Sequence, residues 1–178
     1  MDVQKMVKKA KKGNKEALLQ LIMNQKDDYY RLAFTYMGNK HDAMDAMEDM
    51  IVSLYEKIHQ LKKEEAFYSW SKTILANSCK TLLIKQNKSQ LIDDWTTYTD
   101  TVPSSENPYH KIEQNIDIKQ LLTSLNDKQA EAIKLKYLLD LDYETISVMT
   151  NVSVGTVKSR VFEGLKKLKN LYGGNGDE

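Results

Sequence analysis

Three closely spaced helix starts between residues 126 and 172 limit the folds open to this chain more than any other feature. They predict helices over residues 126–139, 143–150 and 153–172, with a turn at residues 151–152. Two short helices, a tight turn and a longer basic helix make a helix-turn-helix. The residues that favour these starts are Asn126, Asp142 and Ser153, with Gln129 placed as in a capping box.

The third of these helices presents two different sides at about 100° per residue. The side predicted to be core carries Val157, Val161, Gly164, Leu165 and Leu168. The opposite side carries small, polar and aromatic groups that can enter the major groove, and cations on its flanks can reach phosphates. A solvated face of a three-helix bundle is the alternative, but the caps and the flanks together favour DNA. The expected DNA contacts are Thr156, Lys158, Ser159, Arg160, Phe162, Glu163 and Lys166.

A segment rich in Ser, Thr, Asn and Pro divides the chain. Residues 89–110 contain four acids and no Lys or Arg, and such a composition interrupts helices. We therefore expect an N-terminal domain at 1–88, a flexible acidic linker at 89–110, a C-terminal helix-turn-helix domain at 111–172, and a tail at 173–178. Long alternating β-branched stretches are absent from the sequence, so the fold class is all-α, with two small helical domains.

Helical spacing in the first domain predicts helices at about 14–23, 27–37, 42–60 and 65–85. In the third of these, Met47, Ile51, Leu54 and Ile58 fall at i, i+4, i+7 and i+11, which predicts one buried stripe. The spacing leaves the positions of Met44 and Met50 open.

Several classes of function are excluded by absences from the sequence. There is one cysteine, no nucleophile–base pair, no metal-ligand cluster and no Gly-rich phosphate loop, so we expect no enzyme, no metal and no cofactor. No secretory signal or membrane-spanning run is present, which predicts a cytoplasmic protein without membrane insertion of its own. The net charge of +1 hides two basic regions, +5 over residues 1–88 (16 Lys+Arg, 11 Asp+Glu) and +4 over residues 153–172 (five against one).

Residues 143–147 (Tyr-Glu-Thr-Ile-Ser) and 152–160 (Val-Ser-Val-Gly-Thr-Val-Lys-Ser-Arg) resemble the second conserved domain of bacterial RNA polymerase sigma factors of the extracytoplasmic-function type. Regulators of the LuxR type share part of this signature, so the N-terminal half is needed to distinguish the two families. Residues 30–39 resemble the family's first conserved segment, 41–49 its polymerase-binding helix, and 67–70 with Ile74 and Asn77 its promoter-melting segment. The resemblance covers about residues 5–170 in the family's order.

The resemblance implies a stress-response transcription factor that binds core RNA polymerase, reads two promoter elements and helps to open the duplex. It also implies an anti-sigma partner. Polymerase contact would fall to Asp45, Glu48 and Asp49, for which plain solubility is the alternative. The start-proximal element would be read by Leu61, Lys62, Lys63, Phe67, Tyr68, Trp70, Lys72 and Lys80. Stacking on bases and phosphate contact suit these types, although core packing is the stronger reading for Phe67 and Trp70.

Two departures from the family pattern bear on promoter preference. Thr73 and Ala76 stand where relatives often carry arginine, and Glu163 stands on the DNA face. Two alternatives also stay open at this point. One is a self-standing helix-turn-helix regulator whose N-terminal domain senses a ligand or dimerises, and the other is an adaptor that contacts only proteins.

Overall fold

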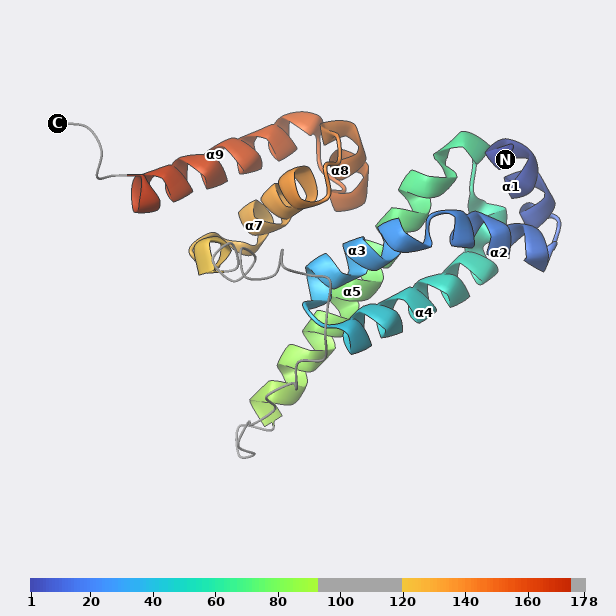
Figure 1. Cartoon of the computed structure of the whole chain (residues 1–178), viewed down its shortest axis with the longest axis horizontal. Helices are drawn as coiled ribbons and strands as arrows, with labels where there is room; N and C mark the ends of the chain where they lie inside the picture. The colour runs from blue at the N-terminus through green and yellow to red at the C-terminus, as the bar shows by residue number, and fades with distance from the viewer. Residues whose placement is uncertain (93–119, 174–178) are drawn as a thin grey trace.

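The computed structural model describes residues 1–92 and 120–173, in which all regular secondary structure is helical and no strand is present. The first half contains α1 (Val3–Lys11), α2 (Lys15–Asn24), α3 (Lys26–Met37), α4 (Lys40–Lys57), the short η1 (Ile58–Gln60) and η2 (Glu64–Ala66), and α5 (Phe67–Ile92). The second half contains α7 (Asp127–Ile133), η3 (Lys134–Leu138), α8 (Tyr143–Thr150) and α9 (Val154–Tyr172) (Figure 1). The all-α prediction is confirmed.

Side-chain caps fix most of these helix starts. Asn14 Oδ1 accepts from the Ala17 amide at 2.9 Å, and Asn39 Oδ1 accepts from the Asp42 amide at 2.9 Å. Each bond satisfies one of the free amides at a helix start. α3 ends at Gly38, which adopts the left-handed conformation with φ 78°, as its sequence position predicts.

α1 is a helix that the sequence reading missed. Val7 and Ala10 are buried against the rest of the domain, and Val3 and Met6 pack beside them. Asp2 caps its start by accepting from the Lys5 amide at 3.1 Å. The apolar spacing at positions 3, 7 and 10 was a usable signal, but it is interrupted by a run of lysines.

The buried stripe of α4 differs from the predicted one. Its buried residues are Ala43, Ala46, Met50 and Leu54, whereas Ile51 is 39% exposed and Met47 only partly buried. The stripe is therefore rotated, because two alanines allow α3 and α5 to approach closely at positions that the larger residues would fill. Ile51, expected in the core, lies on the outer surface. Leu54 and Ile58 are buried as expected.

α5 runs to Ile92, beyond the predicted end at 85 and past the predicted start of the linker at 89. The rest of the predicted linker and most of the helix expected at 111–122 lie outside the described residues, as does the tail after 173; residues 120–123 are helical. α8 has the predicted bounds, and α9 begins after the Ser153 cap and ends at Tyr172 as predicted. The capping box at Asn126 is half formed. Its Oδ1 accepts from the Gln129 amide at 2.8 Å, but the buried Gln129 Oε1 has no hydrogen-bond partner.

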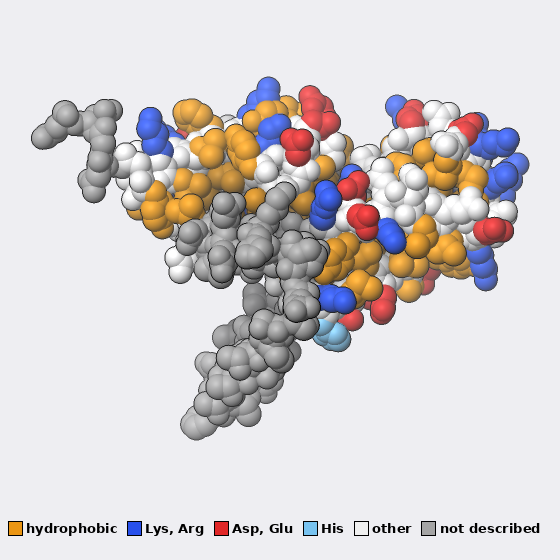
Figure 2. Space-filling model, in the orientation of Figure 1, with side chains coloured by type: hydrophobic (Ala, Val, Ile, Leu, Met, Phe, Trp, Pro, Cys, Tyr) orange, Lys and Arg blue, Asp and Glu red, His pale blue; other side chains and the backbone are white. Residues whose placement is uncertain are grey.

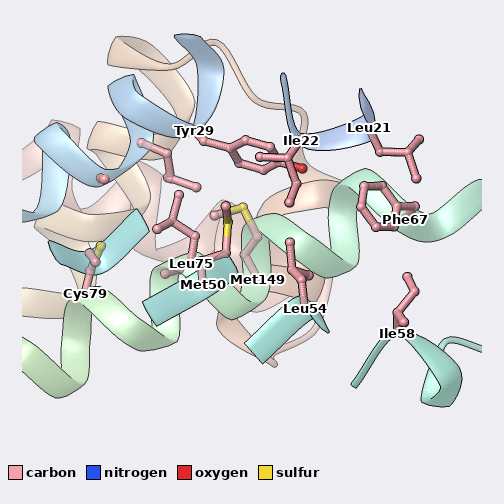
Figure 3. Close-up of a cluster of buried hydrophobic side chains, with 14 of the residues drawn as sticks. Leu21, Ile22, Tyr29, Met50, Leu54, Ile58, Phe67, Leu75, Cys79 and Met149 are labelled. Carbon is pink, nitrogen blue, oxygen red and sulfur yellow. The ribbon is translucent and has the colours of Figure 1, made fainter. Parts of the chain in front are cut away.

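The two halves share one hydrophobic core. Leu135, Ile146, Met149 and Val157 of the second half belong to the same buried cluster as the helices of the first. α8 packs on α5, and Met149 lies among Met50 and Leu75 (Figure 3). The helix-turn-helix therefore rests against the first domain, rather than standing apart from it.

Candidate nucleic-acid and polymerase interfaces

The helix-turn-helix is held in shape by local hydrogen bonds. Asp142 Oδ1 accepts from the Thr145 amide at 2.7 Å, and Ser153 Oγ accepts from the Thr156 amide at 3.1 Å. Between the helices, Asn151 adopts the left-handed conformation with φ 53°, and the Ser147 hydroxyl donates to the Val152 carbonyl oxygen. These contacts set the angle at which α9 leaves α8.

The outer face of α9 carries the residues that the sequence analysis expects to contact DNA. Ser159, Glu163 and Lys166 are exposed, as is Phe162 with 65% of its surface accessible, and Thr156 and Arg160 are half-buried. Val157, Val161 and Gly164 form the buried side. Leu165 is 41% exposed, so its predicted core position is wrong; it lies at the border of the buried face.

Cations near the N-terminal end of α9 are positioned by an aromatic ring. Lys158 Nζ lies 5.6 Å from the centre of the Tyr143 ring, and Lys136 Nζ lies 4.5 Å from it. Such contacts are weak, yet they keep both ammonium groups on one side of α8. The pKa of Asp142 falls below its usual value because Thr145 hydrogen-bonds to it, with smaller effects from Lys136 and Lys72.

The residues expected at the start-proximal element divide into buried and accessible groups. Leu61 is 5% exposed and Phe67 is fully buried, which supports core packing for both side chains. Tyr68 and Trp70 are half-buried and contact the Phe67 ring, with ring centres 5.3 and 6.4 Å away. Lys62 and Lys63, on the loop before η2, are exposed.

The beginning of α5 is anchored to α2 and α3. The hydroxyls of Tyr29 and Ser71 are 2.7 Å apart in the core, and Ser71 Oγ also donates to the Tyr68 carbonyl oxygen at 3.0 Å. Tyr68 itself accepts from Asn24 Nδ2 at 3.2 Å. Burial raises the pKa of Tyr29 well above its usual value of 10.0. The aromatic residues are thus held on a rigid support.

Lys80 of α5 is engaged by the second domain. Its Nζ lies 2.7 Å from Glu131 Oε1, and the Tyr36 hydroxyl donates to the same oxygen at 2.8 Å. Lys72 is close enough to Asp142 to contribute to the lowered pKa of that carboxyl. In this arrangement, two of the lysines expected to contact phosphate, Lys72 and Lys80, have acidic groups of the helix-turn-helix domain nearby.

The outer surface of α4 combines acids with apolar side chains. Glu48 and Asp49 are exposed, while Asp45 is half-buried and lies 3.6 Å from His41 Nε2. Beside them, the exposed apolar residues are Met44, Ile51, Val52 and Tyr55, between 39% and 57% accessible. Hydrophobic side chains reach the surface over α3 and α4 (Figure 2). This mixture is typical of a protein-binding surface. The sequence predicted its acids and left Met44 open, but it did not predict that Ile51, Val52 and Tyr55 would be exposed there.

One group within the described residues could offer metal ligands. His41, Asp42 and Asp45 bring one ligand atom each within 4.8 Å of one another. They lie on the first turns of α4, and Asp42 Oδ2 already accepts from Asn39 Nδ2 at 2.7 Å. The group is open to solvent, and hydrogen bonding to Asn39 lowers the pKa of Asp42.

Comparison with known proteins identifies the family. The family model for sigma-70 region 2 matches residues 21–89, and the model for sigma-70 region 4 matches residues 116–168. SigV of Bacillus subtilis, an RNA polymerase sigma factor, is 29% identical over 161 residues, covering 90% of this chain and 94% of the relative. The chain belongs to the extracytoplasmic-function group of sigma-70 factors. As a sigma factor, it is a transcription initiation factor that directs RNA polymerase to promoters, and not a catalytic enzyme.

Further relatives of this sigma factor match along nearly its whole length. SigW of Bacillus subtilis is 27% identical over 179 residues, and the sigma-E factor of Haemophilus influenzae is 27% identical over 177 residues. These matches cover 95% and 94% of this chain, and 96% and 93% of the relatives.

Two solved structures share the fold of this sigma factor. CnrH, in complex with the cytosolic domain of CnrY, has a TM-score of 0.70 at 16% identity and covers 98% of this chain and 99% of its own. RpoE of Bartonella quintana, in complex with the anti-sigma factor NepR, has a TM-score of 0.68 at 22% identity, covering 88% and 97%. Among the helices described here, none is both long and apolar enough to cross a membrane.

Proposed function

We propose that this sigma factor reads an upstream promoter element with α9 and a start-proximal element with the loop 60–65 and the beginning of α5. The observation that carries the proposal is the exposed face of α9, where Ser159, Phe162 and Lys166 project between the flanking Lys158 and Arg160. A helix of this composition fits the major groove, and its cations fit the phosphates on either side.

Duplex opening is assigned to the start-proximal reading surface, formed by the loop 60–65 and the beginning of α5. Tyr68 and Trp70 offer half-buried rings on a support fixed by the Tyr29–Ser71 contact, and Lys62 and Lys63 lie on the adjoining loop. The loop 60–65 would hold one promoter base outside the stack, which costs a few kcal/mol that aromatic stacking and phosphate contacts can offset. Lys80 can join these contacts only after it leaves Glu131, so its binding to phosphate competes with the contact between the two halves.

Binding to core polymerase is assigned to the outer surface of α4. Glu48 and Asp49 would supply charge complementarity, and Ile51, Val52 and Tyr55 would supply apolar area. We expect Val52→Asp to weaken core binding at least ten-fold, measured by fluorescence anisotropy of labelled sigma factor. Ile84→Asp is the matched control, because Ile84 on α5 is 56% exposed against 57% for Val52. Equal effects of the two changes would contradict the assignment.

An anti-sigma factor is the proposed regulator, since the related RpoE of Bartonella quintana was solved with one. The experiment that tests the whole function is run-off transcription with core polymerase, with and without this protein, on many promoters including its own upstream region. We expect promoter-specific initiation only with the protein present. Tight DNA binding without polymerase, and no stimulation on any template, would instead support a self-standing regulator.

A further inference from the structure

The first helix carries the densest positive charge of the chain. Residues 1–15 contain six lysines and one acid. The apolar side of α1 is buried in the domain, where Val7 is 0% and Ala10 is 3% exposed, so the lysines occupy the outer side. Figure 2 shows blue side chains gathered at the end of the molecule that α1 occupies in Figure 1.

Lys11 fixes this helix against the loop after α4. Its Nζ donates to the Leu61 carbonyl oxygen at 2.8 Å and to Glu64 Oε1 at 3.2 Å, with only a quarter of the Lys11 side chain exposed. One ammonium group thus bridges the two ends of the loop to α1. The loop is the one proposed above to hold an unstacked promoter base, so α1 forms the wall beside that position.

Lysines on both sides of this contact remain open to solvent. Lys8 lies one turn before Lys11, and Lys12 follows Lys11 directly at the end of α1. Both side chains are exposed, as are those of Lys62 and Lys63 in the loop. Within the described residues, none of these four lysines forms an ion pair. The pKa of Glu64 is lowered first by its own backbone amide, then by Lys11, and to a smaller extent by Lys8. The Lys8 charge is therefore close to the loop.

The four exposed lysines on α1 and the loop indicate which kind of partner this surface binds. Lysines act as point charges that suit phosphates in a flexible backbone and read no sequence. A membrane surface is a poor fit, because a membrane-binding helix needs a free apolar side and that side of α1 is buried. The backbone on either side of an unstacked base must cross the surface next to the loop, which these lysines line.

We propose that Lys8 of α1 and Lys12 at its C-terminal cap, together with Lys62 and Lys63, bind backbone phosphates of the displaced promoter strand beside the base held by the loop. This inference rests on the proposed start-proximal reading. It adds α1 to the DNA-binding surface and gives that helix a role beyond packing. The contact is independent of sequence, so it strengthens binding to every promoter that is opened.

The test compares holoenzymes that contain the wild-type chain, Lys8→Gln/Lys12→Gln, or the control Lys26→Gln/Lys40→Gln, which removes the same charge from exposed positions on α3 and α4. Affinity for a promoter fragment with a pre-melted bubble is measured between 50 and 200 mM salt. Each phosphate contact to a single strand contributes about 0.7 to the slope of log affinity against log salt. The α1 variant should therefore lose about 1.4 from the slope, so that its affinity falls about seven-fold less than the wild type over this range.

Several outcomes decide the matter. A slope equal to that of the control would overturn the inference, as would a loss confined to core polymerase binding, which would make this surface a protein contact. Equal loss on a duplex carrying only the upstream element would also overturn it, because α1 would then act non-specifically. Failure of the wild-type holoenzyme to bind the bubble would instead contradict the proposed function. Circular dichroism of each variant confirms that it is folded.

Discussion

Replacing Glu131 by alanine should loosen the contact between the two halves of this sigma factor. Glu131 Oε1 is the shared partner of the Tyr36 hydroxyl at 2.8 Å and Lys80 Nζ at 2.7 Å. The Tyr36–Glu131 bond links residues 95 positions apart in sequence, and both bonds join one domain to the other. Burial raises the pKa of Tyr36 far above its usual value, with Glu131 adding to the effect, so the hydroxyl stays protonated and donates.

The magnitude follows from how exposed each partner is. The Lys80 side chain is 35% exposed and can regain water, so loss of its ion pair costs about 0–1 kcal/mol. The Tyr36 hydroxyl loses its acceptor in a part-buried position, which costs about 1–2 kcal/mol. Together they destabilise the closed arrangement by about 2 kcal/mol, which is roughly 30-fold in the equilibrium between closed and open forms.

Energy transfer between fluorophores on the two halves measures this change. Cysteines placed at His41 and Asn170, both exposed, accept the labels. Cys79 stays unlabelled, because it is fully buried and burial raises the pKa of its thiol to about 12. With a urea dependence of about 1.5 kcal/mol per molar, the midpoint for separation of the halves should fall by roughly 1 M. Glu144→Ala is the matched control, since Glu144 is an exposed acid on α8.

The reasoning is refuted if Glu131→Ala and Glu144→Ala separate at the same urea concentration. That result would mean that apolar packing of α8 on α5 holds the halves together without help from the polar triad. Circular dichroism at each urea concentration separates movement of the halves from unfolding of either one.

Three further predictions concern the core, pH and promoter preference. Ser71→Ala should cost about 1–3 kcal/mol because it orphans the buried Tyr29 hydroxyl, whereas Tyr29→Phe should cost about 1 kcal/mol; additive effects in the double variant, measured by urea unfolding, would contradict this coupling. Since the folded pKa values of Cys79, Tyr29 and Tyr36 are raised, stability should be full below about pH 9 and fall above it, by up to about 1.4 kcal/mol per pH unit for each group. Alkaline unfolding of Tyr36→Phe should be shallower above pH 10, and a slope unchanged from wild type would be the contrary result. Glu163→Ala should alter preference at one upstream base pair, because a carboxylate can accept from cytosine N4, and unchanged relative binding across a panel of single-base variants would exclude that role.

Local features of this fold could be predicted because their causes are local. The caps at Asn126, Asp142 and Ser153 depend on residues three positions apart, and all three accept the expected amide. The outward face of α9 follows from its periodicity alone. The region 2 and region 4 matches agree with the order inferred from the sequence.

Packing between elements could not be predicted in the same way. In α4, an Ala43–Ala46–Met50 face and a Met47–Ile51 face are comparably apolar, and only contact with α3 and α5 decides which one is buried. The burial of the start-proximal residues was equally hard to predict. Phe67 has a ring that could stack on a base, but tertiary packing places it in the core. α1 was hidden because lysines dominate its composition.

Nothing in one sequence indicates that Tyr36 and Glu131 meet. Their separation leaves no periodic or spacing signal, and each is an ordinary member of an amphipathic helix. The closure of the helix-turn-helix onto α5 is therefore knowledge that only the structure supplies, and it changes the interpretation of Lys72 and Lys80 from free phosphate ligands to residues with acidic neighbours.

The shared core also limits how promoter specificity can be engineered by exchanging parts between related factors. Ile146 and Met149 of α8 pack into a cluster that includes Leu75 and Cys79 of α5. A chimera that receives a foreign helix-turn-helix would set mismatched side chains against α5, even where every base-reading residue is correct. Grafting only the outer positions of α9 leaves that seam intact. The outer residues of α9 can thus be exchanged freely, whereas the residues at the α5–α8 interface must be exchanged together on both helices.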